Sequence, residues 1–254
     1  MKILCTTVLI FYILFVKGQN DNMAYVAGGK FVPLYGSVNK KPISIDPFFL
    51  DKTPVTHQEF LSFINKYPKW QRNKVKKIFA GENYLEKWPS DTNFPKELQN
   101  SPVTQISWFA AKAYCECVGK RLPTVNEWEF AAMASQTEID ARKNEAFTRE
   151  ILSGYETPNT YKKEVGISKA NYWGIYDLHN MVWEWTLDFN SIMISGENRD
   201  KNNTNLFCGA SALGADDLMN YAAFMRYAFR SSIQANFSIN SLGFRCAQDL
   251  KEKG

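Results

Sequence analysis

Histidine is scarce in this chain: its 254 residues include only His57 and His179. Two imidazoles exclude a metal centre built from three histidines. A facial triad of two histidines and one acid needs both rings at one metal, but His57 stands at a predicted helix start and His179 in a polar turn. We therefore expect His57 to be exposed, and we expect neither histidine to bind a metal or to serve a Ser-His-Asp catalytic site.

No cysteine follows the N-terminal apolar run closely, which argues against the lipid anchor of a lipoprotein. Lys2, the apolar run Ile3–Val16 and the small Gly18 are typical of a secretory signal peptide. The run is shorter than the roughly 20 apolar residues that span a bilayer. We predict a signal peptide over 1–18 and a single domain over 19–254, exported to the periplasm or the extracellular space and without a membrane partner after cleavage.

A strong charge of either sign is absent as well. The chain has 30 basic and 26 acidic residues, and the predicted signal peptide takes Lys2 and Lys17 from the basic set. Four basic residues lie close together in the sequence: Arg72, Lys74, Lys76 and Lys77. Aromatic side chains do not interleave with them as in nucleic-acid sites. We predict a solvated helix face over 74–79 and no nucleic-acid partner.

Cysteine is present in a number that suits disulfides. Of the five cysteines, Cys5 falls in the predicted signal peptide. The other four are Cys115, Cys117, Cys208 and Cys246. An even number of cysteines in an exported chain predicts disulfides, but the spacing leaves all three pairings open.

Local signals predict many short elements. Thr56 with Glu59 and Thr124 with Glu127 have the spacing of capping boxes, which begin helices. The polar residues 135–169 are typical of surface elaboration. The expected elements are strands over 23–31 and 48–51, helices beginning after Thr56, Ser107 and Thr124, and shorter helices over 74–79 and 145–152. This pattern indicates one α+β domain without a large regular sheet.

The most informative stretch is GIYDLHNMVWEWTLDF, residues 174–189. Trp183 and Trp185 are two residues apart, so in a strand both point to one face and Glu184 to the other. Asp177 precedes them across a polar turn. Two carboxylates around a turn of main-chain carbonyls form an oxygen donor set of the kind that calcium prefers. A plain turn former is the alternative role of Asp177.

This stretch resembles a segment of the formylglycine-generating enzyme family, also called the sulfatase-modifying-factor domain. Five other segments resemble that family in the same order: GGKF (28–31), FFLDKTPVTHQEF (48–60), SPVTQISWFAAKAYC (101–115), KRLPTVNEWEFAA (120–132) and NSLGFRC (240–246). The resemblance covers nearly all of the chain after residue 22. It implies the α+β fold of this family, which is similar to the C-type-lectin-like architecture.

The resemblance also shows what has been lost. Formylglycine-generating enzymes oxidise a substrate cysteine with oxygen, using two cysteines that bind copper. Counted back from GFRC without gaps, their positions hold Asp217 and Ala222, and no cysteine occurs between Cys208 and Cys246. Because this chemistry needs thiolates, we expect neither copper nor formylglycine generation. Related sulfoxide synthases bind iron through three histidines, so we expect no iron either.

Two structural features are implied by the resemblance alone. One is a disulfide between Cys115 and Cys246, which leaves Cys117 and Cys208 as the remaining pair. The other is a structural calcium ion. Its ligands would be the side chains of Asp177 and Glu184 and the main-chain carbonyls of Asn180 and Val182.

The family's substrate groove corresponds here to Trp183, Asp217, Tyr221, Arg226 and Arg230. If Asp217 is buried, it should pair with one of the two arginines. We hypothesise an exported domain that binds a protein or peptide partner in this groove, as an extracytoplasmic maturation or assembly factor. The alternatives are an enzyme of changed chemistry, such as an oxidoreductase-type modification of a protein or small molecule, and a lectin-like structural binder.

Overall fold

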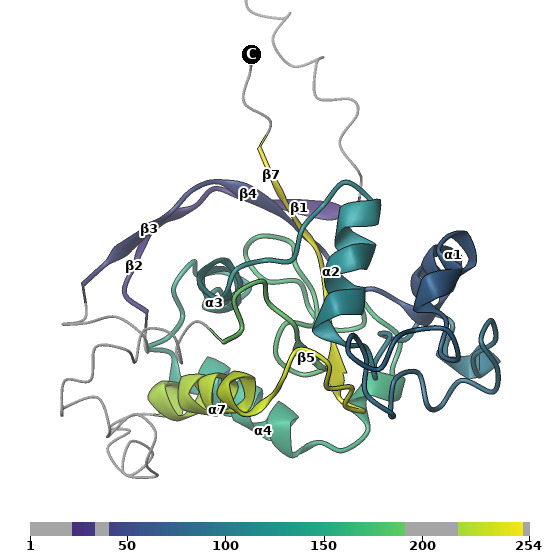
Figure 1. Cartoon of the computed structure of the whole chain (residues 1–254). Coiled ribbons are helices and arrows are strands. Elements are labelled where there is room, and N and C mark those ends of the chain that lie inside the picture. The colour runs from purple at the N-terminus through teal and green to yellow at the C-terminus, as the bar shows by residue number, and fades with distance from the viewer. Residues whose placement is uncertain (1–21, 34–40, 191–217, 251–254) are drawn as a thin grey trace, which may run out of the picture.

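The structure is a computed structural model that describes residues 22–33, 41–190 and 218–250 (Figure 1). Its largest described sheet has three antiparallel strands in the order β1-β4-β7. These strands are β1 (Met23–Val26), β4 (Phe48–Asp51) and β7 (Ala247–Asp249). Since β4 pairs with both neighbours, the two ends of the domain lie in one sheet.

Two small sheets complete the described strands. The antiparallel pair is β2 (Gly29–Phe31) with β3 (Ile43–Ile45), and the parallel pair is β5 (Trp183–Glu184) with β6 (Leu242–Gly243). Gly28 turns the chain between β1 and β2 with φ +69°, and a Cβ there would lie 2.2 Å from the carbonyl oxygen of Ile45. Only glycine suits this position. The expectation of short strands without a large regular sheet is confirmed.

The helix starts follow the predicted caps. In α1 (His57–Lys66) and α3 (Val125–Ala132), both halves of the capping box are formed. Ser107 caps α2 (Trp108–Cys117), and Gly119 follows that helix with φ +73°. The other long helices are α4 (Glu145–Glu156) and α7 (Leu218–Ser232). Single turns of 3-10 helix cover Pro68–Trp70, Lys96–Leu98 and Thr160–Lys162.

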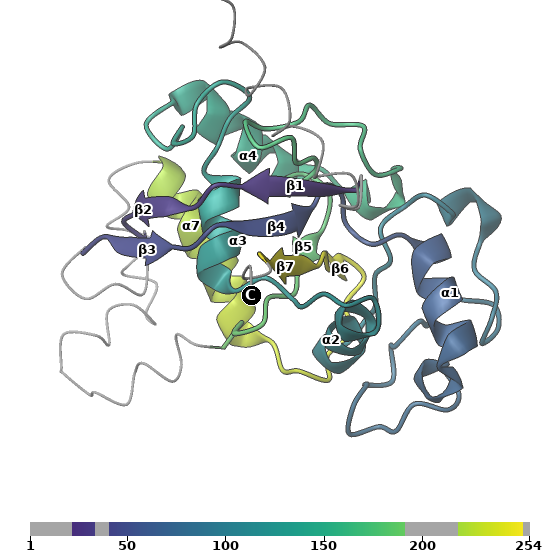
Figure 2. The same ribbon diagram turned by 90° about the horizontal axis from the view of Figure 1, so that it is seen from above.

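The arrangement places α3 under the three-stranded sheet, with α4 and α7 side by side on the far side of the molecule from that sheet (Figure 1). Seen from above, α1 stands at one end of the domain and α7 near the other (Figure 2). A disulfide joins Cys115 of α2 to Cys246, the residue before β7, and both side chains are fully buried. Cys117 forms no disulfide with a described residue, and Cys208 lies outside the described residues.

Three local predictions are wrong. His57 is buried with an exposed fraction of 4 %, because Trp88 Nε1 donates a hydrogen bond to its Nδ1 at 3.1 Å and Phe94 packs on its ring. Residues 74–79 form turns instead of a helix. The segment 135–169 is more than surface elaboration, because α4 packs against α7 and buries Ile151. Within the described residues, no helix has the length and apolar composition needed to cross a bilayer.

Candidate functional site

Trp183 of β5 and Trp185, the residue that follows this strand, lie in two different environments. Trp185 is fully buried in the core, and its Nε1 donates to the carbonyl oxygen of Ile106 at 2.7 Å. Trp183 is half-buried and packs against two rings, Tyr155 at 5.0 Å and Phe229 at 4.7 Å between centroids. We call these three residues, from α4, β5 and α7, the aromatic wall.

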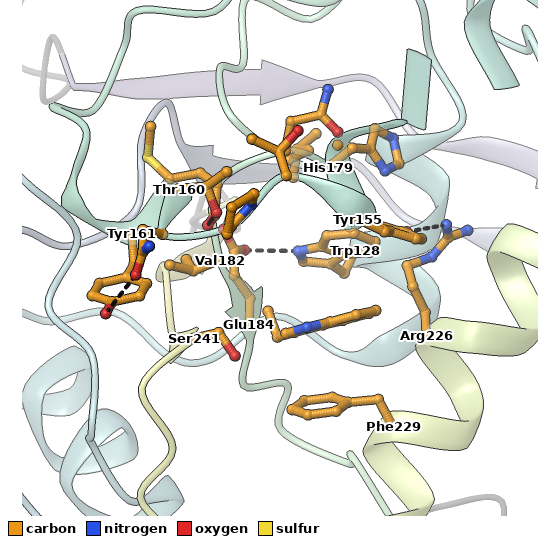
Figure 3. Close-up of a pocket in the computed structure, with 18 of the residues that line it drawn as sticks. Trp128, Tyr155, Thr160, Tyr161, His179, Val182, Glu184, Arg226, Phe229 and Ser241 are labelled. Atoms are coloured by element: carbon orange, nitrogen blue, oxygen red, sulfur yellow. Dashed lines mark hydrogen bonds between the residues drawn. The ribbon is translucent and has the colours of Figure 1, made fainter. Parts of the chain in front are cut away.

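The aromatic wall borders a cavity of about 230 Å³ (Figure 3). In the close-up, Arg226 and Phe229 reach the cavity from α7, while Thr160 and Tyr161 lie on the other side. Its remaining lining comes from Trp128 of α3, from Gly154, Tyr155 and Thr157–Asn159, from the stretch 178–184, and from Arg230 and Ser241. Five separate segments of the sequence therefore meet here.

Two buried arginines of α7 share one buried carboxylate. Arg226 donates through Nε and Nη2 to Glu129 of α3 at 2.7–3.1 Å, and Arg230 donates through Nη1 at 2.7 Å. A further bond joins Arg226 Nη1 to the Tyr155 hydroxyl at 3.0 Å. Both guanidinium groups also lie over the Trp128 ring, at 5.7 and 4.9 Å from its centroid. We call Glu129, Arg226 and Arg230 the arginine cluster.

Electrostatics keep the carboxylate of this cluster ionised. Burial by itself would raise the pKa of Glu129, but the charges and hydrogen bonds of Arg226 and Arg230 outweigh burial and lower the pKa from 4.5 to about 2. The same attraction raises the pKa of Arg226 above its ordinary value, against the opposing effect of burial. The cluster thus holds two positive charges and one negative charge.

A second buried carboxylate, Glu184 of β5, has a single arginine partner. Arg245 donates through Nε and Nη2 to its oxygens at 2.8–3.0 Å, and neither side chain is exposed. Trp128 Nε1 donates to Glu184 Oε2 at 2.7 Å (Figure 3). Arg245 also donates to the carbonyl oxygens of Asp51 and Tyr176. This pair is balanced in charge and surrounded by donors and acceptors.

His179 and Asn180 lie where the turn reaches the cavity. His179 Nε2 faces the carbonyl oxygen of Ala132 at 2.7 Å. Burial and, secondly, the charge of Arg226 lower the pKa of His179 to about 4, which leaves the ring neutral at pH 7. The side chain of Asn180 lies directly on α4, since a Cβ at Gly154 would come within 1.8 Å of its Oδ1. Glycine at 154 therefore permits the close approach of α4 to the turn.

The predicted calcium ligands have other partners in this structure. Asp177 adopts φ +61°, and its carboxylate accepts hydrogen bonds from the backbone N–H groups of Gly166 and Ser168. Glu184 is held by Arg245, so its charge is already compensated. Among the described residues, no three His, Cys, Asp or Glu side chains are grouped to hold a metal ion. The donor set fits calcium poorly while the Glu184–Arg245 pair is intact, and calcium stays a prediction.

The structure brings together three of the five predicted groove residues. Trp183, Arg226 and Arg230 all line the cavity. Tyr221 lies outside its lining, with 40 % of its surface exposed, and Asp217 falls outside the described residues. Glu129 pairs with both arginines. The predicted pairing of Asp217 with one of them stays a prediction, because Asp217 lies outside the described residues.

The sequence analysis missed Glu129 and Tyr155. A signal for Glu129 was present, because it lies within the EWEF segment one residue after Trp128. For Tyr155 the signal was weaker: it belongs to the helix that we ended at 152, and its contacts are all distant in the sequence.

Comparison with known proteins now identifies the family. Residues 15–250 match the family described as the sulfatase-modifying factor enzyme 1-like domain. The chain belongs to this family. It is 28 % identical over 281 residues to the inactive Cα-formylglycine-generating enzyme 2 of Bos taurus, which covers 91 % of this chain and 89 % of the relative.

Other members of the family are similar to a comparable degree. The formylglycine-generating enzyme of Bos taurus is 27 % identical over 267 residues, covering 84 % of this chain and 69 % of the relative. The solved structure of PvdO from Pseudomonas aeruginosa matches with a TM-score of 0.52 and 18 % identity, over 90 % of this chain and 94 % of that chain. PvdO therefore supports the shared α+β fold. Overall identity separates the active relative from the inactive one by only one percentage point.

Within the family, the residue at the lost thiol position is therefore the more informative feature. Ala222, which the ungapped count back from GFRC places where the resemblance implies one catalytic cysteine, is fully buried in α7 and clusters with Ile151 of α4. An alanine there packs tightly against α4 and offers no metal ligand. The lost cysteine and the inactive relatives support a non-catalytic formylglycine-generating-enzyme-like domain.

Proposed function

We propose that this protein is an exported binding domain that holds a segment of a partner protein, and so acts in maturation or assembly outside the cytoplasm. The observation that carries the proposal is the cavity between the aromatic wall and the arginine cluster. Export rests on the predicted signal peptide at 1–18. The resemblance to the family supports the proposal, because three residues of the expected substrate groove, Trp183, Arg226 and Arg230, line this cavity.

The lining of the cavity indicates what kind of segment it would hold. Trp183 and Phe229 present apolar ring surface, which favours an apolar or aromatic side chain of the partner. Among the described residues, Arg226 and Arg230 exceed their carboxylate partner by one positive charge, which favours an acidic side chain or a C-terminal carboxylate. A short peptide with an apolar residue next to an acidic one satisfies both requirements.

The two alternatives have less support from the described residues. An enzyme of changed chemistry needs a reactive group, but the lining includes no cysteine, its carboxylate Glu184 is paired with Arg245, and its imidazole, His179, is bonded through Nε2 to the carbonyl oxygen of Ala132. A lectin-like binder would recognise a neutral sugar, for which the positive charge of the arginine cluster provides no ionic partner. We therefore place peptide binding first.

A peptide library tests the proposal. Peptides selected on the exported protein should share an apolar residue beside an acidic one, and a synthetic version should bind in isothermal titration. Trp183→Ala should weaken its Kd by about tenfold or more, the loss of one large buried aromatic contact. Trp173→Ala is the matched control, because Trp173 is also half-buried but packs on Phe130, away from the cavity.

Two outcomes would contradict the proposal. If selected peptides bind Trp183→Ala as well as the unmodified protein, the binding site lies elsewhere. If Trp173→Ala and Trp183→Ala weaken binding equally, the effect comes from general loss of stability. Thermal melting of both variants distinguishes that case.

A further inference from the structure

The segment that follows α1 carries the most exposed large apolar side chain of the described structure. Ile78 has 72 % of its surface exposed, and its neighbour Phe79 has 39 %. Both lie in the turns that replace the predicted helix over 74–79. We call residues 74–79 the basic tip. A helix would have let these side chains turn inward, whereas the turns leave Ile78 in solvent.

Apolar rings support the base of this tip. Phe79 contacts Trp70 at 6.2 Å and Phe109 at 5.3 Å between centroids. Another exposed ring, Phe237, belongs to a segment tied to this region by the hydrogen bond from Gly81 N–H to the Asn236 carbonyl oxygen at 2.8 Å. Exposed large apolar side chains that gather in one region of a surface favour an interaction site.

Basic side chains are frequent in the tip and in the residues just before it, and Lys69 lies over the ring of Trp70, which contacts Phe79. The exposed members are Lys66, Lys69, Lys74, Lys76 and Lys77. The acid beside them, Glu82, faces Lys77 at 3.4 Å, with both side chains almost fully exposed. Asp91 accepts a hydrogen bond from the Asn73 N–H group and is the next acid that touches the segment. Positive charge is therefore in clear excess around Ile78 and Phe79.

We infer that the basic tip docks on an anionic lipid surface. Ile78 and Phe79 would enter the boundary between headgroups and acyl chains, while the lysines remain at the level of the lipid phosphates. Exposed apolar side chains together with lysines favour a lipid surface over a nucleic acid, because a nucleic acid offers no apolar phase for the side chain of Ile78. This inference is independent of the proposed peptide site, and it reverses our expectation from the sequence that the exported domain has no membrane partner.

The position of the tip suits docking of this kind. It follows α1, at the end of the domain away from α7, whose arginines line the peptide cavity (Figure 2). A domain bound to a bilayer through this end would keep the α7 end of the domain turned away from the lipid. Docking and peptide binding are thus compatible at the same time.

Vesicle flotation with the purified exported protein tests the inference. The test vesicles contain phosphatidylcholine with about 30 % phosphatidylglycerol, which resembles a moderately anionic membrane. We expect the protein to bind these vesicles and not vesicles of pure phosphatidylcholine. High salt should weaken the association, because it screens the lysine charges. Ile78→Ser with Phe79→Ser should reduce the association at least about tenfold. Lys74→Ser with Lys76→Ser should reduce it about fivefold for each lysine.

The chain offers matched controls for both pairs. Ile167 is 59 % exposed, so Ile167→Ser removes a comparable aliphatic side chain outside the tip. Lys162 and Lys163 are exposed in a different segment, so Lys162→Ser with Lys163→Ser removes the same charge. Both controls should bind anionic vesicles within about twofold of the unmodified protein, because surface substitutions away from a contact have small effects.

Three results would overturn the inference. One is the absence of flotation with anionic vesicles, and another is equal binding to neutral vesicles. The third is a loss of binding in the lysine variant while the Ile78/Phe79 variant binds normally. That pattern would mean that the tip recognises charge alone, as in contact with an acidic protein, and that no apolar insertion takes place.

Discussion

Glu184 and Glu129 are both buried carboxylates next to Trp128, but their surroundings differ. Glu184 has one arginine partner, Arg245, and the pair is neutral with both side chains buried, although Glu184 also borders the cavity. Glu129 has two arginine partners, Arg226 and Arg230, and both belong to α7 and line the cavity. Trp128 touches both groups, donating through Nε1 to Glu184 and lying beneath the two α7 guanidinium groups.

The comparison separates a structural ion pair from one suited to binding. A neutral, buried pair that also bonds main-chain carbonyls gains nothing from a ligand, because its polar atoms are already satisfied. A cluster with one surplus positive charge at the edge of a cavity gains from an incoming anion. Chemically similar side chains therefore serve the fold in one place and recognition in the other.

Arg245→Met gives the largest expected effect. It leaves the Glu184 carboxylate buried without a counter-charge, and it removes the donors to Asp51 and Tyr176. We expect a loss of about 3–5 kcal/mol in the free energy of unfolding, the usual cost of breaking a buried ion pair. Urea denaturation measures it. A loss below about 1 kcal/mol would mean that water reaches Glu184.

Acid should weaken the fold through His179, whose ring packs against Trp128. Its pKa is lowered from 6.5 to about 4 in the folded state, so the unfolded chain binds more protons between these values. Stability is complete above pH 6.5 and falls as the pH drops toward 4, by about 3 kcal/mol at 1.36 kcal/mol per pKa unit.

His57 also destabilises the fold as the pH falls from 6.5 toward 4, because burial lowers its pKa to about 4 as well. Glu129 adds a loss only below pH 4.5, as the pH approaches its folded pKa of about 2. Urea midpoints measured from pH 7 to pH 4 should therefore fall, and His179→Asn should make that fall shallower. An equal slope in the variant would show that His179 is solvated in the native state.

Arg230→Met should cost less than Arg245→Met, because Glu129 keeps Arg226. We expect a loss of about 1.5–3 kcal/mol of unfolding free energy, the range of a hydrogen bond to a charged group, together with weaker binding of the acidic peptide. Denaturation and titration on the same variant compare the two effects. If Arg230→Met destabilises as strongly as Arg245→Met, both groups are structural and the contrast between them fails.

Calcium gives the smallest expected effect. The sequence predicts a stabilising site at Asp177 and Glu184, but binding there competes with Arg245 for the Glu184 carboxylate. We expect millimolar calcium to change the Tm by less than about 2 °C relative to chelator, since weak binding adds little free energy to the folded state. A clear rise in Tm that Asp177→Asn abolishes would support the predicted site and show that Glu184 exchanges partners.

The local elements followed from the sequence because their causes are local. Each capping box joins residues three apart, and the strand over 48–51 has the same limits in the structure. The disulfide was different: spacing left three pairings, and only the resemblance singled out Cys115 with Cys246. The prediction of a short helix over 74–79 was wrong, because the basic residues of this segment suit turns at a surface equally well.

The sequence by itself determined the family and the starts of α1, α2, α3 and α4. It also showed that no cysteine lies between Cys208 and Cys246, and it singled out Trp183, Arg226 and Arg230 as groove residues. What only the tertiary structure decided is which groups meet. Glu129 reaches Arg226 across 97 residues, and Trp128 reaches Glu184 across 56. The burial of His57 depends on Trp88, 31 residues away. Contacts over such separations leave no periodic signal, because the packing of distant elements, not the local backbone, selects the partner of each buried charge.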